Sequence, residues 1–227
     1  DLLVGAGGTF GESADVRMKG QVQAEGDLTE PRAMEINGVF DEVAVRLGPR
    51  VVKSVAPFPL RLESGRFALG PAHFTGEASD LEIATSGSIQ EGDVAGSLKG
   101  TLDLAVVSSL WSELRGGGPL AIDATLAGTL EHPDLEGRIT LHEGRLRFIG
   151  YPQSLESIDA EAVLAGQTLT LASFHAIQGG GEIAATGRVE FAGVVPKSLK
   201  AEFTGANVSA KFPVGFKGTY QGKIEVE

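Results

Sequence analysis

Apolar and polar residues alternate with a period of two along most of this 227-residue chain. Within residues 120–130, for example, Leu120, Ile122, Leu126 and Leu130 all occupy even positions. Because successive side chains of an extended strand point to opposite faces, this period predicts strands with one apolar and one solvated face. The same alternation recurs in residues 94–106, 135–141, 146–148, 158–164, 169–171, 183–191, 199–203 and 224–226. Such strands are typical of an antiparallel sheet with one wet side, so an all-β fold is expected.

One helix is expected to interrupt the strands, near residues 107–115. Val107, Leu110, Trp111 and Leu114 are spaced at i, i+3, i+4 and i+7, and a run of glycines follows. We interpret this segment as a cap over one end of the sheet. A membrane-surface anchor is the alternative, which the short length and the lack of flanking basic residues disfavour.

Four pairs of segments match each other in the same order along the chain, which indicates an internal repeat of roughly 100 residues. Two units are therefore predicted, residues 1–105 and 106–217, with an extra hairpin near 153–173 in the second. Residues 218–227 are read as the start of a further unit, so the chain is expected to be a segment of a longer protein. The matching pairs are 26–31 with 128–133, 60–69 with 139–148, 81–89 with 181–189, and 96–104 with 218–226.

Composition and charge exclude several classes of function. The net charge of −11 disfavours a nucleic-acid-binding surface, and lysines and arginines are scattered singly, so no basic patch for lipid headgroups is expected. The absence of cysteine excludes disulfides and thiolate sites, and no stretch has the length of a membrane span.

The motifs of common catalytic and ligand sites are not found. The glycine run at 179–181 does not continue into a dinucleotide fingerprint, because position 184 is alanine, so it is read as a bend or bulge in a strand. His73, His132, His142 and His175 lack the spacing of metal ligands, and no serine nucleophile motif occurs. We therefore expect no cofactor, no metal and no enzymatic activity.

The unusual property of the chain is its amount of apolar sheet surface. More than a dozen strands each carry an aliphatic stripe, and one short helix is too small to cover them. The sheet must cover itself as a closed core, or leave an apolar trough for acyl chains or for an amphipathic polypeptide strand. Sequence alone leaves both possibilities open.

The second unit resembles the repeat region of the TamB family, within the wider AsmA-like group. The similarity covers residues 90–225 and, more loosely, 20–89. It is carried by the G-x-L-x-x-P-x-x-x-G motif at Gly128, Leu130, Pro133 and Gly137, a Gly-Arg hairpin at Gly144–Arg145, the strand "SLESIDAEAVLAG" and the turn and strand beginning "GGGEI".

This resemblance implies an elongated, repetitive antiparallel sheet curled into a groove, called a β-taco, with an apolar interior. It implies a periplasmic protein of a Gram-negative bacterium, tethered to the inner membrane in its full-length form. The implied function is conduction of phospholipid acyl chains between inner and outer membranes in outer-membrane biogenesis. A BamA-like outer-membrane barrel is the implied protein partner.

The residues expected to line such a groove share the apolar parity of their strands. Two alternatives remain at this point: a chaperone groove for strands of outer-membrane proteins, and a closed structural or adhesive β-solenoid. The candidate lining residues are Leu98, Leu102, Leu104, Leu120, Ile122, Leu126, Leu130, Ile139, Leu141, Leu146, Phe148, Ile158, Leu164, Ile183, Val189 and Phe191.

Overall fold

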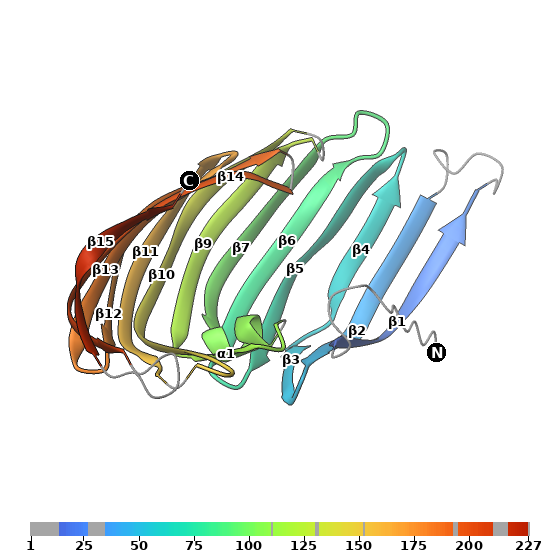
Figure 1. The fold of residues 1–227 in the computed structure, drawn as a ribbon. Coiled ribbons are helices and arrows are strands. Elements are labelled where there is room, and N and C mark those ends of the chain that lie inside the picture. The colour runs from blue at the N-terminus through green and yellow to red at the C-terminus, as the bar shows by residue number, and fades with distance from the viewer. Residues whose placement is uncertain are drawn as a thin grey trace.

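The computed structural model describes residues 14–26, 35–109, 111–129, 132–151, 153–192, 195–210 and 218–226. These residues form one sheet of 15 strands and one short helix, so the expected all-β antiparallel fold is confirmed. The sheet is elongated and curls at its C-terminal end (Figure 1). Its elements are β1 (Ala14–Glu25), β2 (Glu35–Leu47), β3 (Arg50–Ser54), β4 (Phe58–Glu63), β5 (Arg66–Gly76), β6 (Ser79–Ser88), β7 (Val94–Asp103), α1 (Leu104–Ser108), β8 (Leu114–Gly117), β9 (Pro119–Gly128), β10 (Pro133–Phe148), β11 (Leu155–Gly166), β12 (Thr168–Gln178), β13 (Gly181–Ala192), β14 (Val195–Ala210) and β15 (Gly218–Val226).

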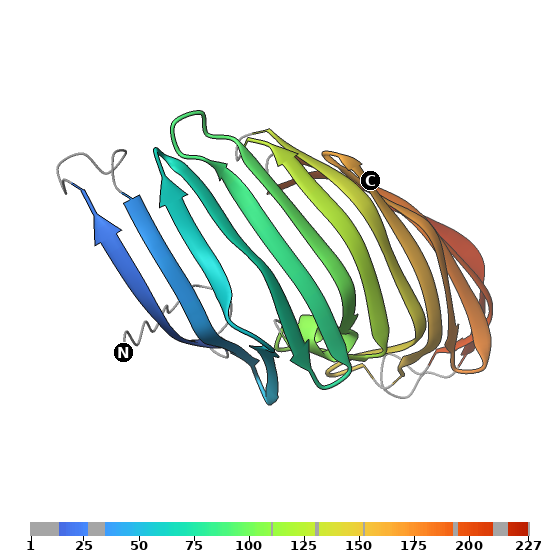
Figure 2. The same ribbon diagram turned by 180° about the vertical axis from the view of Figure 1, so that it is seen from behind.

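The strands follow one another across the sheet nearly in the order of the sequence. Two short strands depart from this order: β4 pairs with β2 and β5, and β8 pairs with β10. Strands β1 and β15 lie at opposite ends and do not pair with each other, so the described strands form an open sheet and not a closed barrel. Seen from behind, the strands lie side by side, and α1 lies behind their lower ends (Figure 2).

Helix α1 begins earlier and is shorter than the sequence predicts. The Asp103 side chain caps it by accepting a hydrogen bond from the Ala105 amide at 2.8 Å. After the helix, the Ser108 hydroxyl accepts a hydrogen bond from the Gly116 amide at 2.8 Å, which fixes the returning strand β8 beside α1. The prediction of one short helix near 107–115 is therefore confirmed, but the helix ends at Ser108 and the last residues of the predicted range turn back and join the sheet as β8.

The glycine run at 179–181 forms a tight hairpin turn and does not bend a strand. Gly179 and Gly180 connect β12 to β13 with φ angles of 58° and 86°, and Gln178 pairs with Gly181 across the turn. Positive φ at both central residues matches the right-handed twist of the flanking strands and is easiest for glycine.

The matched segments 60–69 and 139–148 have the same sequence pattern but different structures. The first forms the β4–β5 hairpin, whereas the second lies inside β10. Glu143 has a φ of 49°, and the pairing of β10 with β11 shifts at Gly144. The hairpin expected at Gly144–Arg145 is wrong, because β8 pairs with the residues after this corner and keeps them in the sheet.

The division into two repeat units, 1–105 and 106–217, stays a prediction. The sheet runs without interruption across this boundary, where β7 pairs with β9. Strands β11 and β12 form a hairpin that covers most of residues 153–173.

The carboxylate of Asp103 joins three segments beside α1. One oxygen also accepts a hydrogen bond from the Gly118 amide at 3.3 Å, and the other oxygen lies 3.3 Å from Arg50 Nη1. Arg50 in turn reaches Glu77 at 2.9 Å. Because the Asp103 side chain is only 12% exposed, its own contacts are shielded from solvent and should fix β3, α1 and the residue before β9 together, whereas Glu77 is 78% exposed.

Replacing Asp103 with alanine should lower the free energy of unfolding by about 2 kcal/mol, because the substitution removes a helix cap and leaves buried amides unpaired. Asp123→Ala is the matched control, since the Asp123 side chain is 66% exposed and, among the described residues, forms an ion pair with Lys99 alone, at 3.1 Å. For the control we expect a change of about 0.5 kcal/mol or less. Urea unfolding followed by circular dichroism measures both, and equal losses would contradict the role given to Asp103.

Candidate functional site

The pairing of the strands aligns apolar side chains into continuous rows across one face of the sheet. In one of these rows large residues flank small ones, since Ala124 and Gly137 lie side by side between Leu98 and Leu164. We call the surface that these rows form the apolar face. Its first row is Ile83, Leu98, Ala124, Gly137, Leu164, Leu169, Val189 and Leu199, and its second is Leu81, Gly100, Ile122, Ile139, Ala162, Leu171, Gly187 and Ala201.

Bulges keep the rows continuous where the alternation of the sequence breaks. In β12 the apolar residues change from odd positions, ending at Leu171, to even positions, beginning at Phe174, and the register with β13 shifts between them. In β5 the same change occurs between Leu69 and Ala72. Each bulge inserts residues that do not pair, so the side chains on both sides of it stay on the apolar face.

The apolar face is only partly buried. Leu98, Ile122 and Ile139 are half-buried, although they lie in the interior of their strands, and Leu126 and Leu164, nearer the strand ends, are half-buried too. Among the described residues only ten apolar side chains are buried, and of these Ile158 alone is fully buried. A face-to-face second layer would bury the central side chains of both sheets. Their partial exposure shows that the middle of the described sheet has no such cover.

The deepest part of the apolar face lies beside α1. Leu141, Ile158 and Ala176 are buried there, and Ile158 is 1% exposed. Leu104 of α1 and Leu146 of β10 pack against this cluster. Helix α1 and the end of β10 therefore cover one end of the face.

A second cluster, near the N-terminal strands, was missed among the candidate residues. Val43, Phe58 and Ala72 are buried there, with Phe40 and Phe74 packed against them. The Phe58 ring centroid lies 5.4 Å from that of Phe40 and 5.9 Å from that of Phe74. The alternation of apolar residues in 58–63 could have pointed to this cluster. The candidate residues were taken instead from the part of the chain where the family resemblance is stronger.

The structure places most of the candidate lining residues on the apolar face; their contact with a ligand stays a prediction. Leu104 belongs to α1, not to a strand, and Phe148 lies at the end of β10 with half of its surface exposed. Leu130 lies outside the described residues. The residues on the face are Leu98, Leu102, Leu120, Ile122, Leu126, Ile139, Leu141, Leu146, Ile158, Leu164, Ile183, Val189 and Phe191.

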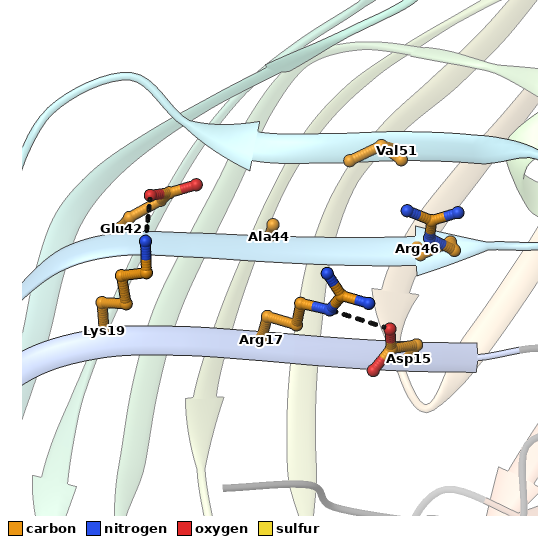
Figure 3. Close-up of a pocket in the computed structure, with 7 residues that line it drawn as sticks. All are labelled: Asp15, Arg17, Lys19, Glu42, Ala44, Arg46 and Val51. Atoms are coloured by element: carbon orange, nitrogen blue, oxygen red, sulfur yellow. Dashed lines mark hydrogen bonds and ion pairs between the residues drawn. The ribbon is translucent and has the colours of Figure 1, made fainter. Parts of the chain in front are cut away.

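The opposite face is polar and carries ion pairs. Figure 3 shows a shallow hollow on this face over β1–β3, in which Arg17 Nε lies 3.2 Å from an oxygen of Asp15 and Lys19 Nζ lies 3.6 Å from an oxygen of Glu42. Exposed pairs of this kind are solvated and add little stability. The described part of the chain has no group of three or more histidine or acidic side chains placed to hold a metal ion. The hollow is lined by Asp15, Arg17, Lys19, Glu42, Ala44, Arg46 and Val51.

Truncation of side chains should separate the covered and the open parts of the apolar face. Ile158→Ala leaves a cavity in a closed environment and should cost about 3 kcal/mol of the free energy of unfolding. Leu126→Ala, at a half-buried position on the open part, should cost about 1 kcal/mol, because less surface returns to water. Urea unfolding of both variants measures the difference. A loss at Leu126 as large as that at Ile158 would mean that the open part is covered.

Comparison with known proteins adds no family to these observations. The chain matches no family model, no curated protein and no solved structure. Within the ranges that the structure describes, no helix combines the length and hydropathy needed to cross a bilayer. The resemblance to the TamB family therefore stays a prediction that depends on the motifs of the sequence.

Proposed function

We propose that the apolar face is a groove for phospholipid acyl chains, and that the protein conducts phospholipid between the inner and outer membranes in outer-membrane biogenesis. The observation that carries this proposal is the continuous aliphatic face without a second layer. Soluble proteins rarely expose large contiguous apolar patches, and those that they expose commonly mark binding sites. An open face of this extent favours an apolar ligand.

The chemistry of the face favours acyl chains over polypeptide. A polypeptide laid across the face would bring backbone amides and carbonyls against leucine, isoleucine, alanine and glycine, where they would lack hydrogen-bond partners. An acyl chain has no such groups and loses nothing by leaving water. The rows also alternate large and small side chains, as at Leu98 and Ala124, and so make a shallow surface without a shaped pocket.

Two other functions are less well supported. A chaperone groove for outer-membrane strands would have to use the free edge of β1 or β15, since the face itself cannot pair with a backbone. A closed adhesive solenoid does not agree with the open order of the described strands. The periplasmic location, the inner-membrane tether and a BamA-like barrel partner belong to the proposal through the family resemblance alone.

Photocrosslinking tests the proposal most directly. A photoreactive amino acid at Leu126 should form adducts with phospholipid, and mass spectrometry of the purified protein should detect bound phospholipid. The same amino acid at Ala127, the next residue on the polar face, is the matched control and should form no lipid adduct. Purified protein without lipid, with crosslinks from Leu126 only to its own strands, would refute the proposal.

Leu126→Arg should reduce the transfer of fluorescent phospholipid between vesicles by tenfold or more, because it places a charge in the path of the acyl chains. The fold should survive, since an arginine at a half-buried site can extend its guanidinium to water. Ala127→Arg, exposed on the other face, should leave transfer unchanged. Equal transfer by the two variants, both folded by circular dichroism, would contradict an acyl-chain path along this face.

A further inference from the structure

Three arginines gather on the short ribbon that β8 forms with the end of β10. Arg115 and Arg147 lie directly opposite each other in the antiparallel register, and Arg145, two residues from Arg147, lies opposite Gly117. Directly opposed residues share one face of a ribbon, and so do residues two apart on one strand. All three side chains are exposed, and a Cβ added at Gly117 would meet nothing within 4 Å. The arginines therefore share one open surface, which we call the arginine ribbon.

The charges of the arginine ribbon are not balanced by the described part of the chain. Like charges directly opposite each other in a sheet repel. The Arg115 guanidinium donates to the backbone carbonyls of Ser112 and Leu114, at 3.1 and 2.8 Å, and Arg145 and Arg147 make no ion pair or side-chain hydrogen bond with any described residue.

Other cations, on the polar face of the sheet, form ion pairs with acidic side chains. Lys99 pairs with Asp123, Arg138 with Glu161, and Arg188 with Glu190. The arginine ribbon thus gathers three cations without a described ion pair in a chain whose net charge is −11.

Large apolar side chains border the arginine ribbon. Ile149, two residues after Arg147, is 57% exposed and donates its amide to the Glu113 carbonyl at 2.7 Å. Phe148 lies opposite Leu114 and, by the alternation of the strand, on the other face of the ribbon. Trp111, which is 53% exposed, begins the turn that leads into β8, where the Leu114 amide donates to its carbonyl at 3.2 Å. An exposed tryptophan and an exposed aliphatic side chain beside arginines are a combination that favours the headgroup region of a bilayer.

We propose that the arginine ribbon, with Trp111 and Ile149, docks on the surface of an anionic phospholipid bilayer. Guanidinium groups bind lipid phosphates through paired N–H donors, and the apolar side chains enter the interface between headgroups and acyl chains. Acidic neighbours limit the cationic surface to these three arginines. Glu113 precedes β8, and Glu143 lies two residues before Arg145. The pKa of Glu113 is lowered by the hydrogen bond from the Ser112 hydroxyl.

This site corrects the expectation that no basic patch exists. The arginines at 115, 145 and 147 are separated in sequence, and only the pairing of β8 with β10 brings them together. The segment at 107–115 was disfavoured as a membrane anchor because it lacked basic neighbours, yet the neighbours come from another strand. The proposal does not depend on the function of the groove, because docking uses the outer surface of the ribbon.

Trp111 provides a direct measurement, because it is the single tryptophan of the chain. Vesicles of phosphatidylcholine with about one third phosphatidylglycerol should shift its fluorescence emission to shorter wavelength and should sediment with the protein. Pure phosphatidylcholine vesicles should do so much less, and added salt should weaken the binding.

Arg145→Gln with Arg147→Gln should weaken binding to the anionic vesicles by about 25-fold, at about fivefold for each basic residue near the surface. Lysine at both positions should largely restore binding, because it restores the charge. Arg138→Gln with Arg188→Gln removes the same charge from paired sites elsewhere on the outer face and is the matched control. Leu126→Arg should leave docking unchanged, which separates this site from the groove.

Three results would overturn the proposal. One is the absence of binding to anionic vesicles at low salt. Another is an equal loss of binding in the two glutamine double variants, which would indicate only a general effect of charge. The third is sedimentation with vesicles while the emission of Trp111 stays unchanged, since the protein would then bind through another surface or only to an associated protein.

Discussion

The ladder of backbone hydrogen bonds between consecutive strands is the interaction on which this structure depends. In most domains two layers bury their apolar faces against each other. Here the described strands make one layer, so each strand is held by its two neighbours and by side-chain contacts along the rows. Small residues in these rows, such as Ala124 and Gly137, reduce crowding on the apolar face and so allow the sheet to curl toward it.

This construction explains why stability and binding compete for the same surface. A second layer would bury the central leucines and isoleucines and increase the free energy of unfolding, but it would also close the face to any ligand. Six of the ten buried apolar residues in the described part of the chain form two clusters, around Ile158 beside α1 and around Phe58 near the N-terminal strands. Most other side chains of the face are only partly buried, while hydrogen bonds of the ladder keep its shape.

The sequence predicted the strand class and the apolar parity because both depend on a period of two that is visible residue by residue. It could not place α1, since the cap at Asp103 and the bond between Ser108 and Gly116 depend on contacts with a strand that returns later. The sequence did not predict the arginine ribbon either, because Arg115 and Arg147 are distant in sequence and only the pairing of β8 with β10 brings them together. The aromatic cluster around Phe58 was missed because the candidate residues were taken only from the part of the chain where the resemblance is strongest.

The bulges in β5 and β12 have a consequence for how such a chain can change its length. In a regular strand, one inserted residue sends every later side chain to the opposite face, so only even insertions preserve an apolar surface. At Leu69–Ala72 and at Leu171–Phe174 the face is kept through a change of parity. Single-residue insertions and deletions can therefore accumulate at these positions. Two diverged copies of one unit can then differ in length by an odd number of residues and still keep their apolar side chains on the same face.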